Sequence, residues 1–488
     1  MFFIMKTNQL LRLSYSIAAV SMVSYPVLAE DLSHKTPNIL IIQTDELSFR
    51  TIGAYRNILS KEQAEMWGEG NVVTTPNLDK LASDGILCSE FYTNCPQSAP
   101  SRACFITGLY NQNNGVIVNG IGLDDKCESF ADVLCDNGYK TGYAGKWHLA
   151  SKADLPGWDP EPDFGFTDNK YMYNNGHWKK MMLDSEGNPH VAVKDKNGRP
   201  SVAVANADSK SYTTDFLTSK TIEFIKENGK KPFCFMLSIP DPHGPNTVRE
   251  PYASMYQKMD FKKPRTWTGN GKGMRTIKPA ELAIYFGMVK CIDDNLGRII
   301  KTLKDKGIYD NTIIVFTADH GDMLGEHDRD DKGVSYEASM KIPFIISCPK
   351  LLPQGKVIKN VMSTVDFKPT LLGLLGMTEK KKSDGTDYSD ILLKGMTDED
   401  YSNVAFCRGP AMRRNDNNGF ICVVSERYKL ECNTQGKINA LYDKVKDPDE
   451  MINFAEDPAY SNIVKDMLDK LYEYGEKYGD ARVKKVNF

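Results

Sequence analysis

The stretch NILIIQTDE, residues 38–46, contains a run of apolar residues and ends in two carboxylates. A continuous apolar run of this kind is typical of a strand that is buried on both faces of a parallel sheet. Asp45 and Glu46 then stand at the carboxyl end of that strand, where open α/β sheets hold their ligands. The stretch therefore predicts an α/β fold with a functional site at one edge of its sheet.

Strand-like and helix-like segments alternate along the rest of the chain. Apolar runs recur at residues 233–240 (FCFMLSIP) and 311–318 (NTIIVFTA), and helix-like segments lie at 75–85 and 279–307. This alternation predicts a large, helix-flanked, mostly parallel sheet. From about residue 401, shorter strand-like runs predict a smaller antiparallel sheet instead.

The composition is that of an ordinary globular protein, with 41% hydrophobic and 26% charged residues among 488. A formal net charge of −3 excludes a protein that coats nucleic acid, so an anionic ligand must meet local positive charge. The 11 cysteines stand singly, without a CxxC pair, which excludes a zinc cluster and a disulfide scaffold.

The first 29 residues have the pattern of a secretory signal. Lys6 and Arg12 supply a positively charged segment before an apolar stretch, and Val27-Leu28-Ala29 offers a small-residue cleavage site. Ser and Tyr residues interrupt the apolar stretch, which falls short of the roughly 20 residues of a membrane anchor. We expect an exported protein, periplasmic or secreted, without a membrane anchor. Its expected parts are a signal peptide (1–29), a catalytic α/β domain (30–400) and a smaller C-terminal α+β domain (401–488).

Polar residues cluster where four of the predicted strands end. A solvated strand end explains any one of these clusters, but four at the same relative position predict that they converge on one site. The clusters are Asp45-Glu46, Lys146 with His148, His243, and Asp319-His320.

Three of these residues, Asp45, Glu46 and Asp319, offer the hard oxygen ligands that Ca²⁺ and Mg²⁺ prefer. Gathering three carboxylates without a cation would cost several kcal/mol, so we expect a divalent ion between them.

The stretch NCPQSAPSRACFITGLY, residues 94–110, predicts the N-terminus of a helix that binds an anion. Pro100 suits the first turn of a helix, whose free N–H groups favour negative charge, and Arg102 adds a guanidinium. Ser98 stands beside this helix start. Its hydroxyl is a weak nucleophile unless a base, a lowered pKa or a metal ion activates it.

Ser98-Ala99-Pro100-Ser101-Arg102, followed by Thr107-Gly108, resembles the signature of the type I, formylglycine-dependent sulfatases of the alkaline phosphatase superfamily. Their pattern is Cys or Ser, any residue, Pro, Ser, Arg, and then Thr-Gly at a fixed distance. Segments such as GYAGKWHL, TADHGDMLGEHD and ALYDKVKDPDE are similar to family segments in the expected order. The resemblance implies an alkaline phosphatase-like fold and a bacterial, serine-type carbohydrate sulfatase.

The same resemblance implies a role for each matching residue. Ser98 would be oxidised to Cα-formylglycine by a radical-SAM maturase, and its hydrated aldehyde would attack sulfur. His148 resembles the base that then releases sulfate, and we favour His243 as the general acid. Arg102 and Lys146 would hold formylglycine and sulfate. His243 and Lys332 would face the leaving oxygen. The metal ligands would be Asp45, Glu46, Asp319, His320 and an oxygen of residue 98.

Two residues depart from the family pattern. Glu46 stands where the family usually has Asp, and its extra methylene shifts the reach of the carboxylate. His320 stands where many members have Asn, and an imidazole nitrogen is an atypical ligand for Ca²⁺.

The expected substrate is a sulfated glycan, because residues 151–212 and 243–252 are rich in polar and aromatic groups. His177, Trp178 and Arg249 are the candidate substrate contacts in these segments. Two alternatives stay open at this point. One is a phosphate or phosphonate monoester hydrolase of the same superfamily, and the other is a pseudoenzyme that only binds sulfated glycan because Ser98 stays serine.

Overall fold

The computed structural model describes residues 36–151, 155–270, 278–398, 404–410 and 419–483, all of which belong to one compact unit. The predicted signal peptide, residues 1–29, lies outside the described residues and stays a prediction. Among the described residues, no helix combines the length and apolar character needed to span a membrane.

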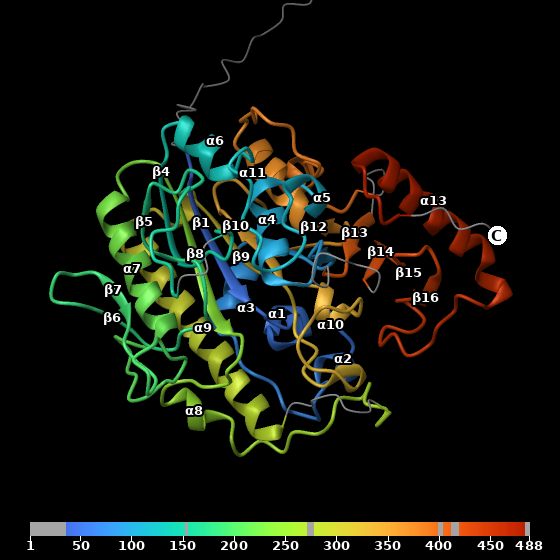
Figure 1. Ribbon diagram of the computed structural model, residues 1–488, viewed down its shortest axis with the longest axis horizontal. Coiled ribbons are helices and arrows are strands. Elements are labelled where there is room, and N and C mark those ends of the chain that lie inside the picture. Colours follow the sequence, from blue (N-terminus) through green and yellow to red (C-terminus); the bar gives the residue numbers. More distant parts are fainter. Residues whose placement is uncertain (1–35, 152–154, 271–277, 399–403, 411–418, 484–488) are drawn as a thin grey trace, which may run out of the picture. The chain divides into compact units, whose positions relative to one another are not determined.

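A mostly parallel sheet forms the centre of the fold (Figure 1). Its eight strands lie in the order β11-β2-β10-β9-β1-β8-β4-β5. Strand β1 pairs in parallel with β8 and β9, and β4 pairs in parallel with β8 and β5. Only β10 runs against its neighbours, β9 and β2. The strands are β1 (Asn38–Asp45), β2 (Ile86–Cys88), β4 (Lys140–Lys146), β5 (Asp168–Tyr173), β8 (Phe233–Pro242), β9 (Thr312–Ala318), β10 (Phe344–Ser347) and β11 (Lys356–Ile358).

Helices cover both faces of this sheet, which confirms the predicted fold class. One group packs together on one face, and a second group packs on the other (Figure 1). The first group is α3 (Pro76–Ser83), α7 (Thr213–Asn228) and α9 (Pro279–Asp305), and the second is α4 (Ser98–Thr107), α6 (Phe130–Asp136) and α11 (Phe367–Leu374). Because both faces are covered, every residue of β1 is buried, as its continuous apolar run predicts.

Short elements connect these layers. They are α1 (Gly53–Arg56), α2 (Lys61–Ala64), β3 (Phe91–Tyr92), α5 (Asn111–Asn114), α8 (Tyr252–Met255), α10 (Glu337–Met340), β12 (Met362–Ser363) and α12 (Ser389–Lys394). Residues 155–212 contain more regular structure than their weak periodicity predicts. Their first strand, β5, joins the edge of the large sheet, and a hairpin of β6 (Met181–Leu183) and β7 (Pro189–Val191) follows.

A four-stranded antiparallel sheet follows the large sheet along the chain, as predicted. Its strands are β13 (Val404–Arg408), β14 (Phe420–Ser425), β15 (Tyr428–Asn433) and β16 (Ile438–Asp443), and helix α13 (Ser461–Tyr478) packs on β14 and β15. The predicted domain boundary at residue 401 falls outside the described residues and stays a prediction.

Helix α4 starts at the carboxyl edge of the large sheet, and three fixed residues of its motif have a visible structural reason. Pro100 lies in the first turn, and the hydroxyl of Ser101 donates to the carbonyl of Asp319 at 2.5 Å. Gly108 ends the helix with φ of 69°, and a side chain there would also collide with Ser383. All ten helix residues are buried, so the motif is part of the core as well as of the site.

Candidate active site

The ends of β1 and β9 bring the first acidic residues of the site together. The backbone N–H of Asp319 donates to the carbonyl of Thr44 at 3.0 Å, and the N–H of Glu46 donates to Oδ1 of Asp319 at 3.2 Å. Asp45 and Asp319 have no solvent exposure. Parallel pairing of the two strands therefore fixes their carboxylates side by side, away from bulk water.

Four side-chain atoms surround a position suited to a cation. His320 Nε2 lies 3.6 Å from Asp45 Oδ1, 3.6 Å from Asp319 Oδ1 and 3.2 Å from Ser98 Oγ. Ligands bonded to one Ca²⁺ at about 2.3–2.6 Å are separated by about 3.3–3.7 Å when they lie at right angles. The spacing therefore fits a single ion, and the three groups Asp45, Asp319 and His320 form one of the candidate metal clusters among the described residues.

The ring of His320 is oriented by a neighbouring carbonyl. Its Nδ1 lies 2.9 Å from the carbonyl oxygen of Gly321, which assigns the N–H to Nδ1 and leaves the lone pair of Nε2 facing the other ligand atoms. Burial lowers the pKa of His320, which favours this neutral form.

Arg102 holds the outer oxygens of both aspartates. Its Nε donates to Asp319 Oδ2 at 3.0 Å, and its Nη2 lies 3.4 Å from Asp45 Oδ2. Its Nη1 donates to the Ser238 hydroxyl at 2.6 Å and to the Lys146 carbonyl at 2.9 Å. The guanidinium is buried, and burial alone would lower its pKa, but Asp319 and Asp45 outweigh burial and raise it. Arg102 thus turns the Oδ1 atoms toward the candidate cation position.

Lys146 lies on the opposite side of Asp45. Its Nζ is 2.5 Å from Asp45 Oδ2, 2.7 Å from His177 Nε2 and 3.5 Å from Ser98 Oγ. Burial raises the pKa of Asp45, but the charge of Lys146 and the contact with His177 outweigh it and hold that pKa well below the usual range. Oδ1 of Asp45 therefore faces the candidate metal ligands, and Oδ2 contacts the ammonium group of Lys146.

Glu46 turns away from the candidate metal ligands. Its Oε1 lies 2.8 Å from Lys332 Nζ, and its Oε2 lies 3.2 Å from His243 Nε2. The residue has φ of 66°, and its carbonyl accepts from the hydroxyl of Tyr285 at 2.7 Å, which fixes this turn of the chain. The structure therefore brings Glu46 to Lys332 and His243 and leaves it outside the cluster of Asp45, Asp319 and His320.

Lys332 and His243 form a hydrogen-bonded pair. Nζ of Lys332 lies 2.8 Å from Nε2 of His243, and Nδ1 of His243 lies 2.9 Å from the Gly244 carbonyl. Burial lowers the pKa of His243 to about 4, aided by Lys332, so the imidazole accepts the hydrogen bond that the lysine donates. Burial lowers the pKa of Lys332 in turn, but Glu46 and Asp45 outweigh it and raise the pKa, so Lys332 is the protonated member of the pair.

His148 presents a neutral imidazole at the end of β4. Burial and the charges of Lys146 and Arg102 hold the pKa of His148 well below its usual value. Its backbone has φ of 64°, and its N–H donates to the carbonyl of Asn174 at 3.0 Å. Within the described part of the chain, Nδ1 of His148 has no hydrogen-bond partner. A half-buried, unprotonated imidazole has the properties of a general base.

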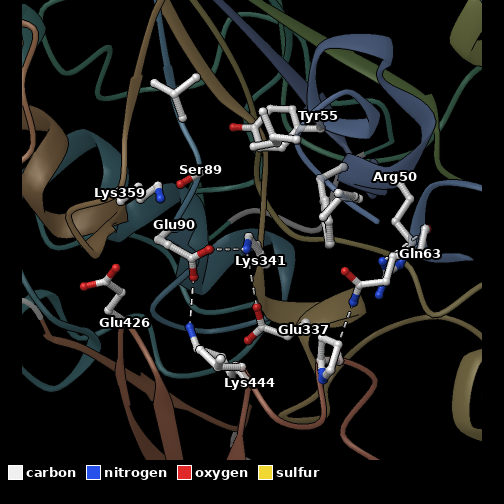
Figure 2. Close-up of a pocket in the computed structure, with 16 residues that line it drawn as sticks. Arg50, Tyr55, Gln63, Ser89, Glu90, Glu337, Lys341, Lys359, Glu426 and Lys444 are labelled. Atoms are coloured by element: carbon white, nitrogen blue, oxygen red, sulfur yellow. Dashed lines mark hydrogen bonds and ion pairs between the residues drawn. The ribbon is translucent and has the colours of Figure 1, made fainter. Parts of the chain in front are cut away.

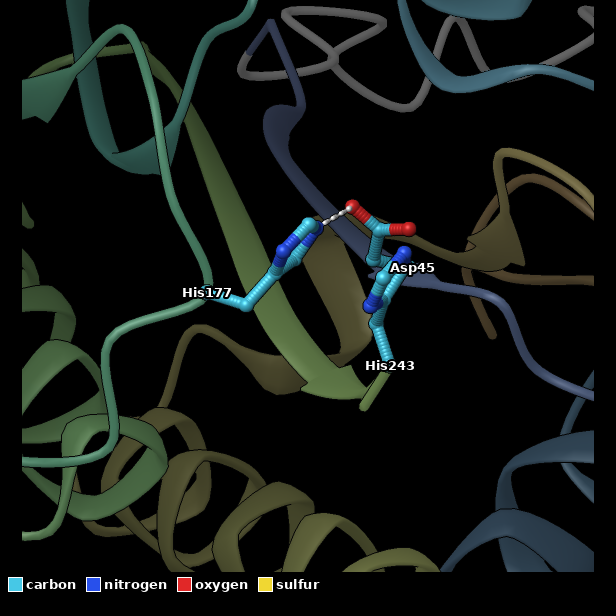
Figure 3. Close-up of side chains that lie close together, drawn as sticks. All are labelled: Asp45, His177 and His243. Carbon is cyan, nitrogen blue, oxygen red and sulfur yellow. Dashed lines mark ion pairs between the residues drawn. The ribbon is translucent and has the colours of Figure 1, made fainter. Parts of the chain in front are cut away.

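The predicted substrate contacts lie in different surroundings. His177 lies in the site, where its ring stacks on His243 with centroids 3.5 Å apart and 6° between the planes (Figure 3). Trp178 is only 4% exposed, and its indole N–H donates to the Asn175 carbonyl. The guanidinium of Arg249 is held by both oxygens of Asp215, at 2.7 and 2.8 Å. Trp178 and Arg249 are thus engaged within the protein, and their predicted sugar contacts stay predictions.

Sequence reasoning missed three charged residues at the site. Asp322 faces Glu46, and burial together with Glu46 raises the pKa of Asp322 well above its usual value. Lys179 and Asp241 form a fully buried ion pair, and Lys179 also donates to the backbone carbonyl of His243. Asp241 lies in the segment SIPDPH, residues 238–243, which ends with the predicted site residue His243, whereas no local pattern marks Lys179 as its partner.

Two cavities differ in their relation to this site. One of about 470 Å³ is lined by Glu46, His243 and Asp322, and so opens beside the Lys332 pair. Another of about 550 Å³ contains the ion pairs of Glu90 with Lys341 and Lys444 (Figure 2). Its lining includes none of the site residues named in the sequence analysis above, so the chemistry of the side chains, and not cavity size, locates the candidate active site.

The sequence is similar to that of known proteins along most of its length. A family model described as sulfatase matches residues 37–377, and one described as N-sulphoglucosamine sulphohydrolase, C-terminal, matches residues 325–477. An N-acetylglucosamine-6-O-sulfatase of Bacteroides thetaiotaomicron is 26% identical over 98% of this chain and 92% of its own length.

Solved structures extend the similarity to three dimensions. A structure described as a putative sulfatase of Bacteroides fragilis has a TM-score of 0.77 at 27% identity, covering 93% of this chain and 98% of that one. A protein solved in complex with D-glucosamine-2-N,6-O-disulfate has a TM-score of 0.74 at 23% identity, covering 92% and 100%. The latter identity is low enough that its likeness supports the fold alone.

Proposed function

The chain belongs to the sulfatase family, and from this premise we propose that it removes sulfate from sulfated sugars with a formylglycine made from Ser98 and a divalent cation. The resemblance of the SAPSR segment to sulfatases is confirmed by the match over residues 37–377, and the chain is a sulfuric ester hydrolase. The observation that carries the proposal is the placement of Ser98 beside Asp45, His320 and Lys146 at the start of a buried helix.

Two similar proteins point to a sulfated amino sugar as the substrate class. One relative is named an N-acetylglucosamine-6-O-sulfatase, and one solved neighbour holds a disulfated glucosamine. We propose that this chain acts on sulfated sugars of the same general kind, released from glycans. Phosphate and phosphonate ester hydrolysis is the more distant alternative.

We propose Ca²⁺ as the cation. Asp45, Asp319, His320 and the oxygen of residue 98 would hold it, and the ion would stabilise negative charge on the reacting oxygens. Glu46 was predicted as a further ligand from the resemblance. Its carboxylate pairs with Lys332, so a role at the metal requires it to turn or to act through a neighbour.

The positions of the other residues support the roles that the resemblance implies for them. Once formed, formylglycine supplies a hydrated aldehyde, the nucleophile that a plain serine hydroxyl does not provide. Lys146 lies within 3.5 Å of Ser98 Oγ and carries positive charge toward the sulfate oxygens. The neutral imidazole of His148 takes a proton, and the Lys332–His243 pair delivers one to the leaving sugar oxygen.

The decisive experiment produces the protein with and without a radical-SAM sulfatase maturase. Conversion of Ser98 lowers the intact mass by one molecule of H₂, and only the converted protein should release sulfate from N-acetylglucosamine 6-sulfate and related sugars. The Ser98→Ala variant should show neither effect. A preference for matched phosphate esters would favour the alternative hydrolase, and unconverted protein that binds sulfated sugar without turnover would favour a pseudoenzyme.

The predicted export also remains a proposal. It rests on the pattern of residues 1–29, and a mature N-terminus at Glu30 in the exported fraction would support it.

A further inference from the structure

Lys179 and Asp241 form an ion pair that has no solvent exposure. Nζ of Lys179 donates to Oδ1 of Asp241 at 2.6 Å, and both side chains are 0% exposed. The sulfur of Met288 lies 3.3 Å from the same Nζ, so the ammonium also faces an apolar side chain. Buried ion pairs are often no more stabilising than apolar residues of the same volume. Stability alone therefore does not explain why a buried ion pair is present at this position.

Both members of the pair hold the backbone that carries His243. The ammonium of Lys179 donates to the His243 carbonyl at 2.9 Å. Asp241 lies two residues before His243, and its Oδ2 accepts from the hydroxyls of Tyr212 at 2.7 Å and Thr214 at 2.5 Å. The imidazole of His243 thus projects from a backbone that is fixed from two sides.

The same lysine also brings His177 into the site. The segment around Lys179 is tied to the start of α7, because the N–H of Thr213 donates to the Lys179 carbonyl at 3.2 Å. His177 lies two residues earlier and stacks its ring flat on that of His243 (Figure 3). Its Nε2 accepts from Lys146. One buried pair therefore aligns two rings that come from separate segments of the chain.

We propose that Lys179, acting through Asp241, is a positioning residue for the leaving-group side of the reaction. The Lys179–Asp241 pair keeps His243, on which the His177 ring stacks, within hydrogen-bonding distance of Lys332. This inference rests on the proposed function and deepens it. In that reaction an oxygen of the converted residue 98 would form the new bond to sulfur while the bond between sulfur and the sugar oxygen breaks. The electron pair of the broken bond would stay on the sugar oxygen, which would take its proton from the Lys332 ammonium of the Lys332–His243 pair.

The proposal separates substrates by their leaving group. A sugar alkoxide is a poor leaving group and depends on the donated proton, whereas a nitrophenolate is stable without it. Displacing the Lys332–His243 pair should therefore slow sugar sulfates much more than aryl sulfates. General loss of structure would slow both classes together.

The test uses the double variant Lys179→Met with Asp241→Asn in matured, full-length protein. It removes both charges, Met fills the space of the lysine, and Asn keeps an acceptor for Tyr212 and Thr214. Because uncharged replacements of a buried pair are often neutral for stability, the variant should fold, which thermal unfolding checks. The matched control is Lys180→Met, since the side chain of this neighbouring lysine donates to the carbonyls of Ala205 and Asn206, away from Asp241 and His243.

Turnover is measured with the sugar sulfate that the wild-type enzyme cleaves best and with 4-nitrophenyl sulfate. We expect kcat for the sugar sulfate to fall on the order of 10²-fold with little change in KM, and the aryl sulfate rate to fall less than about threefold. Equal losses on both substrates, or no loss on the sugar sulfate, overturn the proposal.

A second variant covers the case in which the double variant does not fold. Lys179→Gln combined with Asp241→Asn keeps an amide donor for the His243 carbonyl and leaves no unpaired buried charge, and we expect a selective loss of roughly tenfold on the sugar sulfate. An unchanged ratio of the two rates overturns the proposal here too. Failure of the proposed function itself is distinguishable, because the wild-type enzyme would then release sulfate from neither substrate.

Discussion

Arg102 and Asp319 form a buried ion pair in which Nε donates to Oδ2 at 3.0 Å and Nη2 lies 2.9 Å from the same oxygen. The pair joins the helix that begins at Ser98 to the end of strand β9. One residue before Arg102, Ser101 donates to the carbonyl of Asp319, so the helix start holds both the backbone and the side chain of one aspartate. The geometry of the nucleophile and that of the candidate metal ligands therefore depend on each other.

Replacing Arg102 should damage both stability and activity. Arg102→Ala leaves Asp45 and Asp319 short of a buried positive partner, and removing one member of a buried pair typically costs about 3–5 kcal/mol. We expect a loss of that order in the free energy of unfolding, measured by urea denaturation, together with loss of sulfate release.

The substitution Arg102→Lys tests the geometry of the same contact. Lysine keeps the charge but cannot reach Asp319, Asp45 and Ser238 at once, so it should recover part of the stability and little of the activity. Full activity in the lysine variant would contradict the role assigned to the guanidinium.

The candidate cation site predicts a stabilising effect of Ca²⁺. An ion that binds the folded protein alone adds about 2.7 kcal/mol at a hundred times its dissociation constant. We expect the thermal midpoint to rise with saturating Ca²⁺ and to fall with a chelator. The variant His320→Ala should reduce this shift while it leaves the ion pairs of Arg102 in place.

A matched control for the cation test is His190→Ala, because His190 lies on the hairpin strand β7 and not among the candidate ligands. This variant should keep the full response to Ca²⁺. A response that is absent in the wild-type protein, or unchanged in His320→Ala, would speak against the cation site.

A Glu46 variant can distinguish effects on metal binding from effects on proton delivery to the leaving group. Its carboxylate contacts Lys332 and His243, so Glu46→Gln should disturb proton delivery more than metal binding. We expect the Ca²⁺ dissociation constant, measured by calorimetry, to change less than about threefold, whereas kcat for the sugar sulfate falls by at least tenfold or so. A large loss of Ca²⁺ affinity would instead restore Glu46 as a metal ligand.

The convergence of the strand ends was predictable because parallel neighbouring strands place their carboxyl ends at one edge. Asp45 and Asp319 could be assigned to one site for that reason alone. The direction of the Glu46 side chain could not be predicted, since it depends on a backbone with φ of 66° and on distant Tyr285. The partnership of Lys179 with Asp241 was equally hidden, because tertiary packing joins residues 62 positions apart without any local pattern.

Glu90 predicts how stability depends on pH in the cavity of Figure 2. Burial raises the pKa of Glu90, but the ammonium groups of Lys341 and Lys444 outweigh it and lower the pKa from 4.5 to about 2. A carboxyl whose pKa is lowered by folding stabilises the folded state above the unfolded pKa, and this contribution disappears as pH falls from about 4.5 to about 2.

Glu90→Gln should therefore lower the free energy of unfolding near neutral pH, because Lys341 and Lys444 each lose their ion pair with Glu90. The difference from the wild type should shrink steadily below about pH 4.5, since the wild-type carboxyl then takes up its proton as well. Urea denaturation at neutral pH and at about pH 3 measures both values. The control Glu426→Gln changes an exposed glutamate of the same cavity and should show almost no difference at either pH. A deficit in Glu90→Gln that is equally large in acid would mean that the loss comes from packing and not from the ion pairs.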